Sequence, residues 1–212
     1  SRFIDHFELP KRFIPRVREE IQPYYISTPP IDGHPIEIDR TFKRLKDFQS
    51  QIFQKAAKEF ETINQRVLIQ MPTGSGKTRT AMELVAQQFL DHDLCTVIWL
   101  ANSSELCEQA LQCFDETWTF IGDKKVAIHR VWGGHQPNSS KLLDEYSSNF
   151  LVCSFQTLWS KIKAQNTGGL NLKDCNFLIV DEAHIALAET YKKCIFEILR
   201  ASECRLLGLT AT

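Results

Sequence analysis

Apolar residues between positions 67 and 209 gather in six short runs, and longer segments of mixed polarity separate these runs. The runs are VLIQM (67–71), TVIWLA (96–101), VAIHRV (126–131), FLVCS (150–154), FLIVD (177–181) and RLLGL (205–209). They are nearly continuous rather than alternating, which is typical of strands buried on both faces. The pattern predicts six strands of a mostly parallel sheet.

The segments between these runs have apolar residues at helical spacing. They predict helices near 77–91, 104–118, 155–165 and 190–200, and a further helix over 41–64 before the first strand. Residues 132–149 are expected to be mostly loop, with a short helix over 139–146. Strands that alternate with helices predict an α/β fold with helices on both faces of the sheet. Right-handed crossovers then place every loop after a strand at one carboxyl edge, where such sheets bind ligands.

Residues 1–38 have a different character, with mixed charge followed by the stretch PYYISTPPIDGHP, which we interpret as an irregular linker. The sequence is therefore divided into an N-terminal extension and linker, residues 1–38, and one α/β domain, residues 39–212. The first methionine is Met71, and the last residues, LLGLTAT, fall in an apolar, strand-like run. Both features suggest a part of a longer protein.

Composition limits the partners and the compartment. The formal net charge is −1, so any contact with nucleic acid must come from a local groove. No segment approaches the ~20 apolar residues of a membrane span. The seven cysteines contain no CxxC pair and are odd in number, which argues against a disulfide framework and against a zinc site. We expect free, mostly buried thiols and a cytoplasmic location.

A phosphate-binding loop is predicted at 72–78, PTGSGKT, directly between the first strand and the next helix. Two glycines allow consecutive backbone N–H groups to converge on phosphate, and the helix adds the positive end of its dipole. Lys77 is expected to reach the β- and γ-phosphates and Thr78 to offer its hydroxyl to Mg²⁺. Met71 stands where the pattern has its first glycine; the alternative is an ordinary glycine turn. The predicted ATP-binding residues of this loop are Thr73, Gly74, Ser75, Gly76, Lys77 and Thr78.

Two adjacent acids and a histidine end the fifth run, in VDEAH (180–184). Asp181 is expected to bind Mg²⁺ together with Thr78, through the water shell that this ion gives up reluctantly. Glu182 is placed to orient or deprotonate the water that attacks the γ-phosphate. The alternative is a pair of acids that cap the next helix. Lys77, Asp181, Glu182 and His184 are the candidate catalytic residues.

MPTGSGKT, VDEAH and the terminal GLTAT resemble, in order and spacing, motifs I, II and III of superfamily 2 helicases of the DEAH-box type. The resemblance covers roughly residues 41–212 and implies the first of that family's two RecA-like domains. It implies ATP and Mg²⁺ as cofactors, a nucleic-acid partner, with DNA favoured over RNA, and a second RecA-like domain in the same polypeptide. The chain also resembles motor subunits of restriction enzymes, which implies further subunits of a restriction or defence complex.

Other segments extend the resemblance. LKDFQSQ (45–51) looks like the glutamine motif of the family, which implies that Gln49 reads the adenine edge; the alternative is a polar residue on an amphipathic helix. ANSSELCEQA (101–110) is similar to motif Ia, which implies that Ser103 and Ser104 contact the nucleic-acid backbone, although both suit a helix cap equally well.

Two further matches concern nucleic acid and coupling. Ser154 and Thr157 in CSFQTLWS resemble another backbone-contacting motif, with Gly133 and Gly134 as weaker candidates. Thr210 and Thr212 match the motif that couples hydrolysis to domain movement.

The sequence thus favours a nucleic-acid-dependent ATPase, a helicase or translocase, with weak hydrolysis in this segment alone because the family's arginine finger comes from the second domain. Two alternatives stay open: a P-loop ATPase that acts on protein, and a nucleotide-sensing assembly module. Glu182 argues against the second, since nucleotide binding alone needs only the aspartate.

Overall fold

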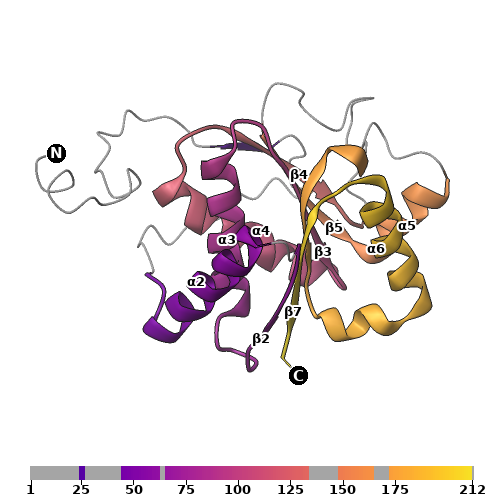
Figure 1. Cartoon of the computed structure of the whole chain (residues 1–212). Helices are drawn as coiled ribbons and strands as arrows, with labels where there is room; N and C mark the ends of the chain where they lie inside the picture. The colour runs from indigo at the N-terminus through magenta and orange to yellow at the C-terminus, as the bar shows by residue number, and fades with distance from the viewer. Residues whose placement is uncertain (1–23, 27–43, 63–64, 134–147, 165–171, 212) are drawn as a thin grey trace, which may run out of the picture.

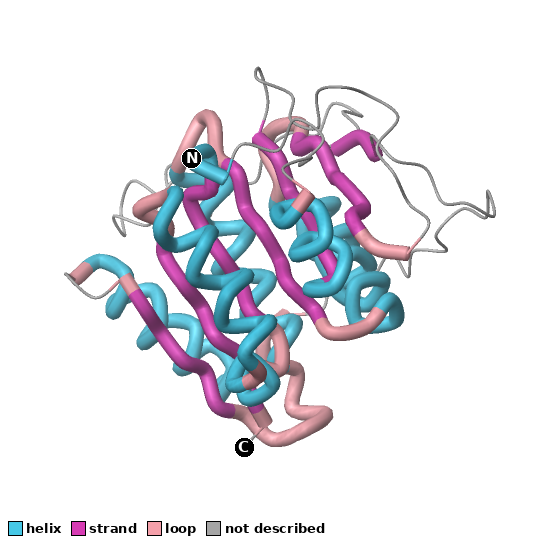
Figure 2. The backbone as a smooth tube through the Cα atoms, turned by 90° about the vertical axis from the view of Figure 1, so that its right-hand side faces the viewer, coloured by secondary structure: helices cyan, strands magenta, loops and turns pink. Residues whose placement is uncertain are grey.

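Within the residues that the structure describes, seven parallel strands pair in the order β1-β4-β5-β3-β6-β7-β2. Figure 2 shows the twist of this sheet. The computed structural model describes residues 24–26, 44–62, 65–133, 148–164 and 172–211. The strands are β1 (Tyr24–Ile26), β2 (Arg66–Gln70), β3 (Thr96–Ala101), β4 (Val126–Val131), β5 (Ser148–Ser154), β6 (Cys175–Val180) and β7 (Arg205–Thr210). Because every pairing is parallel, the loops that follow the strands meet at one edge.

Helices cover both faces of this sheet (Figure 1). One face packs against α2 (Asp47–Glu61), α3 (Lys77–Asp91) and α4 (Ser104–Ile121). The other packs against α5 (Phe155–Lys163) and α6 (Glu189–Ala201), with the 3₁₀ helices η2 (Leu172–Asp174) and η3 (Ala183–Leu187). The predicted fold class, α/β with a parallel sheet between two helical layers, is confirmed.

An aromatic cluster fills the larger of the two core layers. Phe114 of α4 lies 4.5 Å from Phe150 of β5, and Phe89 of α3 lies 5.6 Å from Trp118, measured between ring centroids. These four side chains are fully buried. Aromatic pairs in such tilted and edge-on arrangements add roughly 0.5–1.5 kcal/mol each beyond the area they bury. This layer fixes α3 and α4 on the sheet, and the predicted phosphate loop leads into α3.

All six predicted strands are confirmed, and α3 has the predicted bounds. The linker prediction is wrong for Tyr24–Ile26, which form β1 and pair with Val126–Ile128 of β4. β1 covers an edge of β4 whose backbone groups would otherwise be unpaired. The strand forms because β4, which is distant in the sequence, lies beside it, and the local pattern of apolar residues does not predict it. The short helix predicted over 139–146 lies outside the described residues, and the domain division at residue 38 stays a prediction.

Cysteine side chains follow the expectation of free thiols. All seven are free, and six of them are buried, with Cys113 partly exposed. Across the ranges that the structure describes, none of the helices is both long and apolar enough to pass through a bilayer.

Asp115 is a buried carboxylate on α4. Its exposed fraction is 1 %, and neither carboxylate oxygen has a hydrogen-bond partner within the described part of the chain. Burial, together with the charge of Glu116, raises its pKa from 3.8 to about 6. Because the folded-state pKa exceeds the unfolded value, the stability linked to this group is present below about pH 4. It is lost as the pH rises through 6.

We therefore predict that Asp115→Asn raises the free energy of unfolding by about 1–2 kcal/mol at pH 7.5, because it removes a poorly solvated charge. The gain should shrink on acidification and vanish near pH 4. Urea denaturation at several pH values measures it. Asp91→Asn, at an exposed position of α3, is the control and should stay within about 0.5 kcal/mol throughout. A gain that does not depend on pH would contradict the electrostatic explanation.

Candidate functional site

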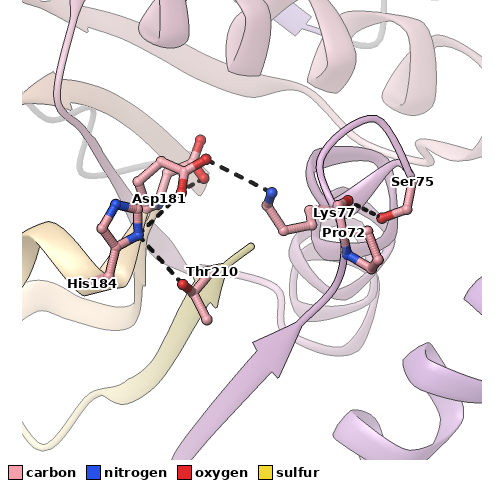
Figure 3. A network of polar contacts seen from close by, with 7 residues as sticks. Pro72, Ser75, Lys77, Asp181, His184 and Thr210 are labelled. Atoms are coloured by element: carbon pink, nitrogen blue, oxygen red, sulfur yellow. Dashed lines mark hydrogen bonds and ion pairs between the residues drawn. The ribbon is translucent and has the colours of Figure 1, made fainter. Parts of the chain in front are cut away.

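The segment between β2 and α3 forms a tight loop around two glycines in the left-handed region. Gly74 has a φ of 73° and Gly76 a φ of 87°. The Ser75 backbone N–H and hydroxyl both donate to the Pro72 carbonyl, at 3.1 and 2.5 Å (Figure 3). A residue with a side chain pays about 1–2 kcal/mol for this backbone conformation, so glycine is favoured at both positions. The loop curls as the sequence predicts for a phosphate cradle.

The beginning of α3 is suited to an anion. Gly76 is the N-cap residue, so no side chain caps the helix, and the first turn holds no acid. The first N–H groups of a helix have no partner within it and carry partial positive charge. Lys77, 8 % exposed, lies at this position, and Thr78 follows it half-buried. Thr73 and Gly74 are exposed at the top of the loop. This arrangement fits a polyphosphate, and it fits a metal ion beside Thr78 if carboxylates lie close by.

Gln49 supports the loop from α2. Its Nε2 donates to the Ser75 carbonyl at 2.8 Å, and its Oε1 accepts from the Lys46 N–H at 2.8 Å. A Cβ atom on Gly76 would overlap the same Nε2. The amide side chain is buried and bonded at both ends, so it braces the phosphate loop. The predicted contact with adenine stays a prediction.

The acid pair follows β6, next to β3 in the sheet. The Asp181 N–H donates to the Leu100 carbonyl at 2.8 Å, which fixes the residue at the carboxyl edge. Glu182 has φ 50° and ψ 54°, and it is the one non-glycine residue with positive φ among those described. Its N–H donates to Asp181 Oδ1 at 3.0 Å. A strained backbone that persists at such a position is typical of a functional site.

Burial raises the pKa of Asp181 to about 6 from the ordinary 3.8. The Glu182 N–H opposes this rise, the Glu182 charge adds to it, and Lys77 lowers the pKa. With an exposed fraction of 5 %, the carboxylate is poorly solvated by water. A cation beside it would favour the ionised form, so the donor set of a hard divalent metal fits this position.

The two segments meet. Lys77 Nζ lies 3.7 Å from Glu182 Oε1, and Figure 3 shows the Lys77 side chain pointing toward the segment that carries Asp181 and His184. The other carboxylate oxygen, Oε2, lies 3.4 Å from His184 Nδ1, which in turn lies 3.4 Å from the Thr210 hydroxyl. Thr210 is buried at the end of β7, and its carbonyl accepts from the Met71 N–H at 3.0 Å. Phosphate loop, acid pair and the last strand therefore form one continuous polar site.

Two of the three serines predicted to contact nucleic acid, Ser103 and Ser154, cap helices. Ser103 Oγ accepts from the Leu106 N–H at 3.3 Å at the start of α4, and Ser104 is exposed beside it. Ser154 Oγ accepts from the Thr157 N–H at 3.3 Å and donates to its hydroxyl at 2.9 Å. In both caps the serine hydroxyl oxygen accepts a backbone hydrogen bond. The first turns of α4 and α5 lie at the same edge of the sheet as the acid pair. Contact with nucleic acid stays a prediction.

Of the remaining candidates, Gly133 has a φ of 55° just after β4. Gly134 and Thr212 lie outside the described residues. The sequence did not predict one group of residues at this edge, Asn102, Gln156 and Tyr191, whose side chains hydrogen-bond to one another. Their spacing in the sequence carries no signal, because each lies on a different connection.

The family model described as type III restriction enzyme, res subunit, matches residues 42–212 of this chain. The chain belongs to this family. The match spans the whole region from α2 to β7, and so includes both halves of the polar site.

Relatives of this restriction-enzyme family domain include proteins of several kinds. The type I restriction enzyme EcoKI endonuclease subunit of Escherichia coli (strain K12) is 26 % identical over 142 residues, 66 % of this chain and 11 % of that protein. The probable ATP-dependent RNA helicase MJ0669 of Methanocaldococcus jannaschii is 29 % identical over 150 residues, 69 % of this chain and 38 % of that protein. The solved helicase domain of Pyrococcus furiosus Hef is 29 % identical, with a TM-score of 0.61, and covers 79 % of this chain and 33 % of that one.

The resemblance to superfamily 2 helicases and to their first RecA-like domain is thereby confirmed, and the chain is a helicase-family ATP-binding domain. It spans between 8 % and 38 % of the length of the curated relatives that it matches.

The bracing of the phosphate loop yields a prediction on stability. Gly74→Ala should lower the free energy of unfolding by about 1–2 kcal/mol, the cost of a positive φ alone, since nothing lies within 4 Å of its Cβ position. Gly76→Ala should cost about 1 kcal/mol more, because its Cβ displaces Gln49 from Ser75.

In a Gln49→Ala background the two alanine substitutions should cost the same, since the displaced side chain is gone. Urea denaturation of the five variants and the wild type measures this cycle. An extra cost of Gly76→Ala that survives in that background would rule out the proposed contact.

Proposed function

We propose that this chain is the ATP-hydrolysing domain of a nucleic-acid-dependent helicase or translocase that acts on DNA in the cytoplasm. The observation that carries the proposal is the 3.7 Å approach of Lys77 Nζ to Glu182 Oε1. It brings the Lys77 ammonium next to the acid pair at the carboxyl edge of the sheet. A P-loop and an acid pair that share a site are the parts that phosphoryl transfer to water requires.

The chain's own residues divide the work. The backbone N–H groups of the loop from Thr73 to Gly76 and of the first turn of α3 would hold the phosphates of ATP. Lys77 would neutralise charge on the β- and γ-phosphates. Thr78 and Asp181 would hold Mg²⁺, which supplies charge neutralisation on the phosphate oxygens when bound.

Glu182 would orient the attacking water and accept its proton. Its backbone conformation directs the carboxylate toward Lys77 on one side and His184 on the other. His184 would hold the second carboxylate oxygen and pass the state of the site to Thr210, at the end of β7. This placement favours turnover over the alternative of a module that only senses nucleotide.

DNA as the partner is supported by the family's description as a restriction enzyme subunit and by the type I restriction relative. The RNA helicase among the relatives makes RNA the competing substrate. Ser103, Ser104, Ser154 and Thr157 would contact the sugar-phosphate backbone from the helix beginnings after β3 and β5. A second RecA-like domain would complete the site, and further restriction or defence subunits would join it.

The decisive experiment measures ATP hydrolysis by the intact protein with single- and double-stranded DNA and RNA in parallel. Stimulation by DNA above that by RNA supports the proposal. Stimulation by RNA alone replaces the substrate, and no stimulation by any nucleic acid favours a P-loop ATPase that acts on protein.

We predict that Glu182→Gln lowers ATP turnover of the intact protein by about 100-fold or more, because a general base is lost. Its affinity for ATP should stay within about twofold. Steady-state hydrolysis and the binding of a fluorescent ATP analogue measure the two quantities. Glu189→Gln, an exposed acid seven positions further at the start of α6, is the control and should change neither. A fall in affinity equal to the fall in turnover would argue against the role of Glu182.

Hydrolysis by residues 1–212 alone is predicted to be far below the ~10 per second of a typical enzyme. The γ-phosphoryl transition state spreads negative charge over its oxygens, and a second domain would neutralise part of it. A single-turnover assay with radiolabelled ATP measures the rate. A turnover near the typical value would show that this domain needs no arginine from elsewhere.

A further inference from the structure

Three polar side chains from three different connections meet at the carboxyl edge, and we call them the edge triad: Asn102, Gln156 and Tyr191. The Tyr191 hydroxyl donates to Asn102 Oδ1 at 2.6 Å and accepts from Gln156 Nε2 at 3.1 Å. Gln156 Nε2 also lies 3.5 Å from the Asn102 carbonyl. One phenol hydroxyl thus bonds to both of the other members.

The triad joins the connections after three adjacent strands. Asn102 follows β3, Gln156 lies in the first turn of α5 after β5, and Tyr191 lies in the first turn of α6 after β6, and these strands are neighbours in the order β5-β3-β6. The ring of Tyr191 also stacks on Phe155 of α5, with centroids 4.3 Å apart and an interplanar angle of 18°. Position and orientation of the phenol are therefore fixed by an aromatic contact and two hydrogen bonds.

A chain of backbone hydrogen bonds links Tyr191 to the acid pair. The Ile185 N–H donates to the Glu182 carbonyl at 2.9 Å, the Ala188 N–H to the Ile185 carbonyl at 3.1 Å, and the Tyr191 N–H to the Ala188 carbonyl at 3.0 Å. Glu182 is the N-cap residue of η3, and Ala188 is both its C-cap and the N-cap of α6. This short segment has little freedom to move at one end without the other.

On the far side of the triad lie the residues assigned to nucleic acid. Asn102 directly precedes Ser103, which caps α4, and Gln156 lies two positions after Ser154, which caps α5, and next to Thr157 in its first turn. The Tyr191 hydroxyl is thus linked to the beginning of α4 through Asn102 and to the beginning of α5 through Gln156. A displacement of either beginning would break a bond of the triad.

We propose that Tyr191 is a positioning residue that couples nucleic-acid binding at the beginnings of α4 and α5 to the placement of Glu182. This inference rests on the proposed function. Nucleic acid that binds the first turns of α4 and α5 fixes the positions of Asn102 and Gln156. These two side chains hold the Tyr191 hydroxyl. Tyr191 in turn holds η3, which keeps the Glu182 backbone in its strained conformation. Coupling between two binding sites is reciprocal. If bound nucleic acid strengthens ATP binding by some factor, bound ATP strengthens nucleic-acid binding by the same factor.

Tyr191→Phe tests the hydroxyl alone, since phenylalanine keeps the ring that stacks on Phe155. In the intact protein, ATP hydrolysis is measured against the concentration of a 30-nucleotide single-stranded DNA and of the corresponding duplex. We expect the half-saturating DNA concentration to rise about 3- to 10-fold, because the two hydrogen bonds of that hydroxyl are lost. Hydrolysis without DNA, the KM for ATP measured without DNA, and the melting temperature should match the wild type.

Two further variants sharpen the test. Gln156→Met removes only the hydrogen bond from Gln156 to the hydroxyl, and we expect the double variant with Tyr191→Phe to be little worse than Tyr191→Phe alone, because that contact is already lost there. Gln112→Met is the matched control. It removes an exposed glutamine whose amide bonds to Glu116 on α4, at 3.2 Å and away from the triad. It should leave every quantity unchanged.

The outcomes separate the inference from the proposed function. If DNA stimulates the wild type and Tyr191→Phe responds to DNA identically, the coupling role is overturned and the proposed function stands. If Tyr191→Phe lowers hydrolysis with and without DNA equally, together with the melting temperature, its role is structural and the inference is likewise overturned. Stimulation of the wild type by no nucleic acid would remove the proposed function and the inference with it.

Discussion

The attraction between Lys77 and the acid pair, at the carboxyl edge of a parallel sheet, is the interaction on which the site depends. Lys77 is almost fully buried, and a buried ammonium needs an opposite charge. Glu182 supplies that charge at 3.7 Å, although the strands from β3 to β6 separate the two residues in the sequence. Since all strands are parallel, the connections after β2 and β6 must lie at one edge, and β7 between them sets their spacing.

Conformational cost concentrates at the same place. Two glycines and Glu182 hold left-handed backbone, and Asp181 keeps a carboxylate where burial raises its pKa. A fold tolerates such features when the surrounding packing is strong. Here the aromatic layer around Phe114 and Trp118 secures α3 and α4, while Gln49 braces the loop from α2. A site that is strained in this way gains from a ligand that brings phosphate to the N–H groups and a cation to the carboxylates.

The polar contacts at the edge extend in two directions from Glu182. Through His184 they reach Thr210, and through η3 they reach Tyr191 and the edge triad. The first direction ends at the last strand, and the second ends at the helix beginnings that carry the capping serines. In the proposed motor, the state of the nucleotide must be transmitted to the nucleic acid, and both paths start at Glu182, the residue that we propose orients the attacking water.

The sequence by itself determined the six strands β2 to β7, the bounds of α3 and the glycine-rich turn of the predicted phosphate loop. Continuous apolar runs mark buried strands, and glycines beside a lysine at a strand end leave few other structures. Only the tertiary structure decided that Tyr24–Ile26 extend the sheet, that Gln49 bonds to Ser75, and that Asn102, Gln156 and Tyr191 meet. Each of these contacts joins segments that are distant in the chain. Such contacts depend on how the layers pack, and no local pattern of residues records that packing.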